Sequence, residues 1–327
     1  MRWRVDRLVG ATEASEWMDG FSDPVFHDDL GTRYCVSWDQ HWVSCLEPDG
    51  SIRWSCGPEP VPGSPVHIFG DLENPAFVSR LSDGGVLVSC FGNHRFVRVD
   101  PEGQEAQVLI DGDTHGLRDT GYGVVDHRGH IWVNEITGCR IWEFSADGQP
   151  IRALGDGQPG FTTEAVPCGE VRFNWVYDIR CGPDGNIYVL DSRNYALRMI
   201  DVERDVVVRV AGTGRPGYTG DGGDPLQATF GSSPDLKYDG PWTLSFDEDG
   251  NIFIGDTQNH VVRMVERSSN TITTIAGRFD YQPGDRNDPL VTDPMRLNFS
   301  RIAGMHYFDR LLYITQEKGE LVILAKT

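Results

Sequence analysis

Two carboxylates and one arginine of this 327-residue chain have the residue types that acid–base chemistry on a small molecule needs. Asp178 and Glu135 each stand in a short apolar run, where a carboxylate can act as a general base or bind a metal ion. Arg301 precedes another such run and could hold an oxyanion or a substrate carboxylate. We predict that these three residues are catalytic.

Aromatic side chains and one histidine would form the walls of a pocket around these groups. Tyr177 precedes Asp178, and Trp242 has the equivalent place in a similar segment downstream. Tyr122 takes the position of Asp178 in a third segment, and His27 lies ahead of the first predicted strand. Carboxylates, an arginine and aromatic walls are typical of a small-molecule pocket. Hydrogen-bonded packing is the alternative interpretation for each of these residues.

Two similar segments indicate the elements that must position these side chains. DGNIYVLDSRNYALRMI begins at Asp184, and DGNIFIGDTQNHVVRMV begins at Asp249. Each contains a strand-like run after an Asp-Gly turn, a second polar turn and another strand-like run. Further apolar runs, VYDIRC or WTLSF before and VVVRVAG or TITTIAG after, complete the unit. The repeated unit is therefore a four-stranded antiparallel meander.

The same unit recurs along the chain, which predicts a ring. Weaker copies follow Gly31, Gly84 and Gly129. Near the end, RLLYITQEKGELVILA gives only two strands, so the terminal unit lacks its last strand. Residues 2–10, RWRVDRLVG, can supply its missing strand and so remove two exposed sheet edges. We predict an all-β, six-bladed β-propeller of four-stranded antiparallel blades. It would be a single domain over residues 1–327, closed by the N-terminal strand.

The repeated units resemble NHL repeats, and AGTGRPGYTGDGGDPLQATFG, from Ala211, resembles the loop between repeats in bacterial NHL proteins. The resemblance covers essentially the whole chain and implies a six-bladed β-propeller, a fold with many functions. Similar stand-alone propellers include gluconolactonase-like hydrolases, strictosidine synthase-like enzymes and virginiamycin B lyase. The resemblance thus implies a small-molecule hydrolase or lyase. A divalent cation (Ca²⁺, Mg²⁺ or Zn²⁺) at the channel mouth is the candidate cofactor.

Long connections between blades predict where the site lies. They fall at residues 57–74, 111–121, 155–174, 212–240 and 278–299. In a propeller these links emerge on one face, and long structureless loops are usually functional. We therefore expect the site at the loop-rich mouth of the channel, with neutral loop growth as the alternative.

Residues repeated between blades are predicted to support the scaffold. Asp191 and Asp256 occupy the same position, as do Asn194 and Asn259. Every blade needs its turns and ladders, so a repeated residue is expected to be structural. Residues that differ between blades at inner positions are better candidates for chemistry.

Several apparent motifs are discounted. GTGRPG, at residues 212–217, contains a proline and precedes no helix, so no nucleotide cofactor is expected. DGDTHG, from Asp111, resembles a calcium loop, but Tyr122 stands where the closing glutamate should be. His127 and His130 flank a turn on the far face with no third ligand apparent, and surface histidines are expected.

Composition limits the partners. A formal net charge of −20 and the lack of a basic patch argue against nucleic-acid and membrane partners. The first residues lack the apolar core of a secretory signal, and seven dispersed cysteines suggest free thiols, so a cytoplasmic location is expected. A small-molecule ligand or substrate is the expected partner. The alternative function is a non-catalytic scaffold that binds a ligand, or a protein on the loop-rich face.

Overall fold

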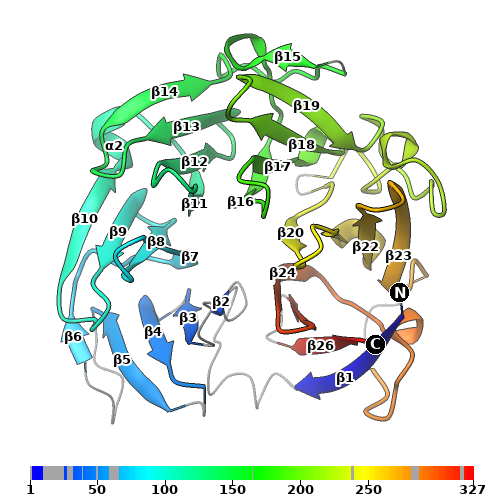
Figure 1. Cartoon of the computed structure of the whole chain (residues 1–327), viewed down its shortest axis with the longest axis horizontal. Helices are drawn as coiled ribbons and strands as arrows, with labels where there is room; N and C mark the ends of the chain where they lie inside the picture. The colour runs from blue at the N-terminus through cyan, green and yellow to red at the C-terminus, as the bar shows by residue number, and fades with distance from the viewer. Residues whose placement is uncertain are drawn as a thin grey trace.

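Six β-sheets surround one central axis in the computed structural model of this chain (Figure 1). The model describes residues 2–9, 26–27, 32–38, 40–48, 51–58, 66–163, 165–236, 239–280, 287–316 and 320–327. The predicted six-bladed β-propeller is confirmed, and within these ranges helical structure is limited to single turns.

The strands of each blade follow from the channel outward. Blade 1 has β2 (Phe26–His27), β3 (Arg33–Ser37), β4 (Trp42–Leu46), β5 (Ile52–Gly57) and β6 (Val66–Ile68), and blade 2 has β7 (Pro75–Arg80), β8 (Val86–Cys90), β9 (Arg95–Val99) and β10 (Ala106–Asp111). Blade 3 has β11 (Thr120–Val125), β12 (Ile131–Glu135), β13 (Arg140–Phe144) and β14 (Pro150–Leu154), and blade 4 has β16 (Val176–Cys181), β17 (Ile187–Asp191), β18 (Ala196–Asp201), β19 (Val206–Ala211) and β15 (Val166–Pro167). Blade 5 has β20 (Thr243–Phe246), β21 (Ile252–Asp256), β22 (Val261–Glu266) and β23 (Thr271–Gly277), and blade 6 has β24 (Ile302–Phe308), β25 (Leu311–Gln316), β26 (Leu321–Lys326) and β1 (Trp3–Val9). The helical turns are α2 (Gly112–His115), η1 (Cys168–Glu170), η2 (Ser192–Asn194), η3 (Pro225–Gln227), η4 (Thr257–Asn259) and η5 (Pro294–Arg296).

The Asp-Gly turns predicted from the repeats join the two inner strands of blades 4 and 5. Gly185 and Gly250 have φ angles of 80° and 79°, a left-handed conformation that glycine adopts without steric cost. Apolar residues rich in β-branched types continue on both sides, and β17 and β21 are buried along their whole length. Turn chemistry and apolar patterning thus agree with the observed blades.

The predicted closure is also observed. β1 pairs antiparallel with β26, from Trp3 opposite Lys326 to Val9 opposite Leu321. The amide of Thr327 donates to the carbonyl of Arg2 at 3.0 Å, and the two ends of the chain lie together in Figure 1. The first strand therefore completes the last blade.

Two blades contain a fifth strand that the repeats did not predict. β15 extends blade 4 on its outer edge, and in blade 1 β6 pairs parallel with β5. β2 pairs with the inner edge of β3, where His27 stands opposite Arg33. The backbone of His27 therefore lies on the channel side of blade 1, while its side chain is outside the described part of the structure.

Neighbouring blades are joined by side chains that accept hydrogen bonds from the next inner strand. Thr243 Oγ1 accepts from the amide of Met305 at 3.1 Å, and Asp178 Oδ2 accepts from the amide of Leu244 at 2.8 Å. Apolar side chains fill the space between the sheets in separate clusters. One cluster includes Trp132 and another includes Phe253. These contacts hold the inner strands at fixed positions around the channel.

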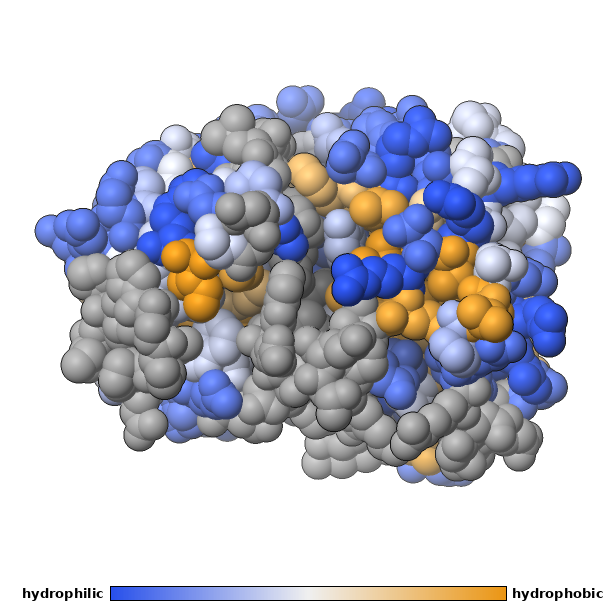
Figure 2. Space-filling view, turned by 90° about the horizontal axis from the view of Figure 1, so that it is seen from below, coloured by the Kyte–Doolittle hydropathy of each residue, from blue (hydrophilic) through white to orange (hydrophobic). Residues whose placement is uncertain are grey.

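On the side of blades 1 and 6, the residues that the structure describes are mostly hydrophilic at the surface, with separate groups of apolar side chains among them (Figure 2). In the part of the chain that the structure describes, no helix has the length and hydrophobicity required to cross a bilayer.

Candidate functional site

A cavity of about 400 Å³ lies in the central channel, and every blade contributes to its wall. Its lining includes Phe77, Val124, Arg180, Ser245 and His306 from the innermost strands of blades 2 to 6, and Tyr34 from β3 of blade 1. Arg80 and Cys181, which end β7 and β16, also line it, so the cavity lies where the inner strands enter their first turns. This channel cavity therefore lies at the end opposite to the loop-rich mouth, where the long links predicted the site.

Arg180, on β16, lines this cavity, and its side chain extends from blade 4 to Phe77 of blade 2. Its Nη1 lies 3.1 Å from Asp178 Oδ1, and its Nε donates to the carbonyl of Leu244 at 3.3 Å. The guanidinium carbon lies 4.0 Å from the ring centroid of Phe77 and 5.0 Å from that of Tyr122. Arg180 is 8% exposed, and residues of blades 2 to 5 hold its planar group in one orientation.

Asp247, a carboxylate on the cavity wall, is already paired. Its Oδ2 accepts from Lys326 Nζ at 3.0 Å and from Asn251 Nδ2 at 2.8 Å. Burial disfavours the charged form of Lys326 and so lowers its pKa. Hydrogen bonds to Asp249 and Asp247 outweigh this effect, and the pKa of Lys326 lies above its ordinary value. Glu248 lies 3.6 Å from the same Nζ on the exposed turn. The charge of Asp247 is thus neutralised by a neighbouring cation.

His306 and Tyr307 bring polar atoms to the wall from blade 6. The amide of Tyr307 donates to Ser245 Oγ at 2.9 Å, which fixes β24 against β20. Sequence comparison of the blades missed His306, although a histidine on an inner strand was a usable signal. Cys181 is the lining thiol, and burial raises its pKa to about 11, so it is protonated at neutral pH and a poor nucleophile.

Tyr177, Trp242 and Arg301, three of the residues predicted from the sequence, form a stack where the inner strands begin, at the end away from the channel cavity. The rings of Tyr177 and Trp242 are parallel to within 17°, with centroids 4.3 Å apart. The guanidinium carbon of Arg301 lies 4.3 Å from the Trp242 ring centroid. Tyr177 is the second residue of β16, and the other two immediately precede β20 and β24. The structure thus brings Tyr177, Trp242 and Arg301 together, beside Asp178.

Glu135 lies apart from this group, on β12. It is 1% exposed, and its carboxylate accepts from the amide of Arg118 at 2.8 Å and from Trp142 Nε1 at 2.7 Å. Asp191 and Asp256 do the same at equivalent positions, accepting from backbone amides at 2.7 and 2.8 Å. Glu135 therefore has the contacts of a scaffold residue.

The repeated asparagines have the supporting role that their repetition indicates. Asn194 Nδ2 donates to Asp191 Oδ2 at 2.8 Å, and Asn259 Nδ2 donates to Asp256 Oδ2 at 2.8 Å. Each pair ties a turn to the strand that precedes it.

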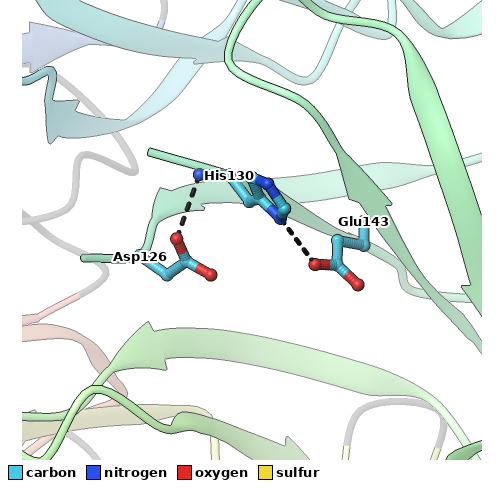
Figure 3. A group of neighbouring side chains, drawn as sticks. All are labelled: Asp126, His130 and Glu143. Atoms are coloured by element: carbon cyan, nitrogen blue, oxygen red, sulfur yellow. Dashed lines mark hydrogen bonds and ion pairs between the residues drawn. The ribbon is translucent and has the colours of Figure 1, made fainter. Parts of the chain in front are cut away.

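A second polar group, on blade 3, has the residue types of a metal site (Figure 3). One ligand atom from each of Asp126, His130 and Glu143 lies within 4.8 Å of the others, so the group could hold a metal ion by its geometry. His130 Nδ1 lies 2.7 Å from Glu143 Oε1, and its amide donates to Asp126 Oδ1 at 3.0 Å. The expectation that His130 has no neighbouring ligands was wrong, because strand pairing brings Glu143 beside it from β13.

The oxygen atoms of this acid–histidine cluster already bind cationic side chains. Arg128 Nη2 lies 2.6 Å from Asp126 Oδ2 and 2.9 Å from Glu143 Oε1. Arg152 Nε donates to Glu143 Oε2 at 2.7 Å. Burial disfavours the charged form of Asp126, but hydrogen bonds from Trp132 and Arg128 outweigh it and lower the pKa of Asp126. Two guanidinium groups thus supply the positive charge that a metal ion would supply, and the cluster does not fit a resident cation.

Comparisons with known proteins support the fold and leave the family open. No protein-family model matches the chain, so the NHL resemblance stays a prediction. SUPPRESSOR OF QUENCHING 1, a chloroplastic protein of Arabidopsis thaliana, is 28% identical over 144 residues. The match covers 42% of this chain and only 12% of that protein.

Solved structures similar over nearly the whole chain include both enzymes and binding proteins. Virginiamycin B lyase from Staphylococcus aureus has a TM-score of 0.58 at 14% identity, with 100% of both chains covered, and a catalytically inactive histidine-to-alanine variant was solved with quinupristin. An auxiliary nutrient binding protein from Bacteroides ovatus has a TM-score of 0.67 at 14% identity, over 99% of this chain and 76% of that one. A luciferin-regenerating enzyme has a TM-score of 0.57 at 12% identity, over 93% and 91%. At these identities the likeness concerns the propeller fold alone.

Proposed function

We propose that the protein is a small-molecule enzyme of hydrolase or lyase type that acts in the channel cavity. The observation that supports this most directly is that one cavity of about 400 Å³ is lined by both His306 and Arg180. Its volume suits a small organic molecule. Hydrolytic and elimination reactions use a proton-transfer group and a group that stabilises negative charge, and residues of both kinds line this cavity.

His306 is the proposed proton-transfer residue. Imidazole changes charge near neutral pH, so it can remove a proton from a water molecule or from a substrate carbon and return it to a leaving group. Arg180 would stabilise the negative charge that develops on a substrate oxygen. Asp178 would act as a positioning residue, because its Oδ1 forms an ion pair with Arg180 Nη1 at 3.1 Å.

The other predicted residues have secondary parts in this proposal. Tyr177, Trp242 and Arg301 would border the approach from the link side of the channel. Glu135 would support the fold rather than the reaction. The carboxylates of the acid–histidine cluster are ion-paired, so the proposed steps use side chains of the channel alone.

A ligand-binding protein without turnover is the second candidate. The structural similarity to an auxiliary nutrient binding protein favours it. The same cavity would then bind its ligand, and His306 would be a hydrogen-bonding residue.

Turnover by the purified protein tests the proposal. The protein is incubated with lactones, aryl esters and cyclic depsipeptides including quinupristin, and products are followed by mass spectrometry. His306→Asn should lower the turnover of any substrate found by about 100-fold or more, the usual contribution of a general base. His94→Asn is the matched control, because His94 pairs with Asp113 on blade 2 outside the cavity and should leave turnover unchanged.

The outcomes separate the two candidates. Equal turnover by wild type and His306→Asn would overturn the assignment of His306. Saturable binding of panel compounds that none of the preparations converts would favour the binding protein.

A further inference from the structure

The channel cavity contains a cationic group in an otherwise acidic protein. Arg80 and Arg180 line it, and the lining carboxylate, Asp247, is paired with Lys326 at 3.0 Å. Glu248 and Asp249 lie beyond this pair on a turn, with side chains 55% and 64% exposed to water. The formal net charge of the chain is −20. The lining therefore places two guanidinium groups beside a carboxylate that already has a cationic partner, and low-dielectric walls strengthen the attraction of these groups for an anion.

Arg180 is built for recognition of a planar anion. Its side chain is 10% exposed, and contacts with Asp178 and Leu244 fix its orientation. A guanidinium has five N–H donors in one plane, so it can bind Asp178 and a ligand carboxylate at once. Because the guanidinium of Arg180 is already ordered before a ligand arrives, less conformational entropy is lost on binding.

Aromatic rings surround this cation and favour an aromatic ligand. Phe77 stacks on Tyr122 with centroids 4.8 Å apart, and Arg180 lies over both rings. Tyr34 and Phe246 continue the apolar wall of the same cavity. A planar ring can pack against Tyr34 and Phe246 while its acidic group reaches the guanidinium.

We infer that the channel cavity binds a small aromatic monocarboxylate, or a substrate that contains one, and that Arg180 is its anion-recognition residue. A monocarboxylate is favoured over a phosphate because Asp178 and Asp247 lie close to the cations and would oppose a second negative charge. This inference rests on the proposed location of the site in the cavity, and its test measures binding without turnover.

Isothermal titration of the full chain with matched probes tests the ligand class. Benzoate, phenylacetate and 2-naphthoate should bind about 10- to 100-fold more tightly than benzamide, phenylacetamide and 2-naphthamide, because the acids make charge-assisted hydrogen bonds to Arg180. Amides that bind as tightly as the acids would overturn the inference. Phenyl phosphate binding more tightly than benzoate would overturn the choice of carboxylate.

Two substitutions locate the binding site. Arg180→Lys should weaken binding of the acids by about 10-fold or more and leave binding of the amides unchanged, because lysine lacks the planar fork. Arg204→Lys is the matched control, because the Arg204 side chain is 82% exposed and pairs with Asp201 outside the cavity, and it should change the affinity for the acids less than about 2-fold. A loss of affinity in Arg301→Lys with none in Arg180→Lys would assign the anion to the Trp242 stack. Circular dichroism confirms folding, and the acid-to-amide ratio on wild-type protein stands if Arg180→Lys does not fold.

The enzyme proposal and this inference can fail separately. Binding of the acids without turnover by any preparation would support the ligand class and contradict catalysis. Turnover of neutral esters with no preference for acids would support catalysis and contradict the ligand class.

Discussion

The channel cavity and the acid–histidine cluster of blade 3 contain similar residue types in different surroundings. In the cluster, Arg128 and Arg152 bind the oxygens of Asp126 and Glu143 at 2.6 to 2.9 Å. In the cavity, Arg180 and His306 line a volume of about 400 Å³. One group is closed on itself, and the other borders space that a ligand can enter.

This difference shows why residue type alone is a poor guide to function. Asp126, His130 and Glu143 have the donor atoms and separations of a metal site, but their partners are consistent with a structural role. Paired charges in a protein interior need no ligand, whereas polar groups on a cavity wall can bind one. Partners and space together decide which group is a candidate site.

The largest expected effect concerns the closed group. Glu143→Gln should lower the free energy of unfolding by about 2 kcal/mol, because it removes a buried charge that binds Arg128, His130 and Arg152. The two arginines are about a third exposed, which limits the loss. Urea unfolding measures it, with exposed Glu203→Gln as a control that should change by less than ~0.5 kcal/mol. Ligand affinity should not change in either variant, and a loss in Glu143→Gln would contradict the separation of the two regions.

Acid should weaken the closed group. Since the folded-state pKa of Asp126 lies below its ordinary value, its ionised form contributes stability above the unfolded-state pKa and loses it as pH falls through the folded one. The stability difference between wild type and Asp126→Asn should thus be largest near pH 7 and shrink in acid below about pH 4. Thermal unfolding across this range measures the difference. A stability difference that does not change with pH would show that packing and neutral hydrogen bonds of Asp126, and not its negative charge, stabilise the fold.

Removal of an arginine should turn the closed group into a metal site. Wild-type protein should show no stabilisation by Zn²⁺, whereas Arg128→Met should gain about 1 kcal/mol once Zn²⁺ exceeds its Kd several-fold. The ligand atoms of Asp126, His130 and Glu143 would then be available to the ion. Thermal shift with Zn²⁺ and with EDTA measures this gain, and Arg128→Met/His130→Asn should abolish it. Stabilisation of the wild type by Zn²⁺ would show that the arginines do not exclude a cation.

The smallest expected effect concerns the stack beside the cavity. Arg301→Met should lower the free energy of unfolding by about 0.5 to 1 kcal/mol, because it removes a cation–π contact with Trp242. Turnover and ligand affinity should change less than about 2-fold. A large loss of turnover with unchanged stability would restore Arg301 as a catalytic residue.

Repetition in the sequence was sufficient to predict the propeller, because blades 2 to 5 each have a glycine with positive φ in the inner turn, at Gly84, Gly129, Gly185 and Gly250, next to buried strands. It also identified the scaffold role of Asp191 and Asp256, since every blade faces the same requirement. β2 and β15 escaped prediction because two-residue strands have no readable period.

The candidate site was less accessible to sequence reasoning. Asp178 differs from its counterpart Thr243, yet both accept a backbone hydrogen bond from the next blade. Different residue types can therefore perform the same structural task. The reach of Arg180 across the channel to Phe77 depends on the diameter of the ring, which no single repeat specifies.

The pairing of β1 with β26 affects the order of folding. Trp3 and Lys326 stand almost a full chain length apart, so their contact has a large loop-closure cost until the intervening blades have formed. We expect this seam to form among the last steps and to open among the first. While the seam is open, the edge of β26 is unpaired and can pair with strands of other molecules. Aggregation during refolding should therefore depend on how quickly β1 pairs with β26.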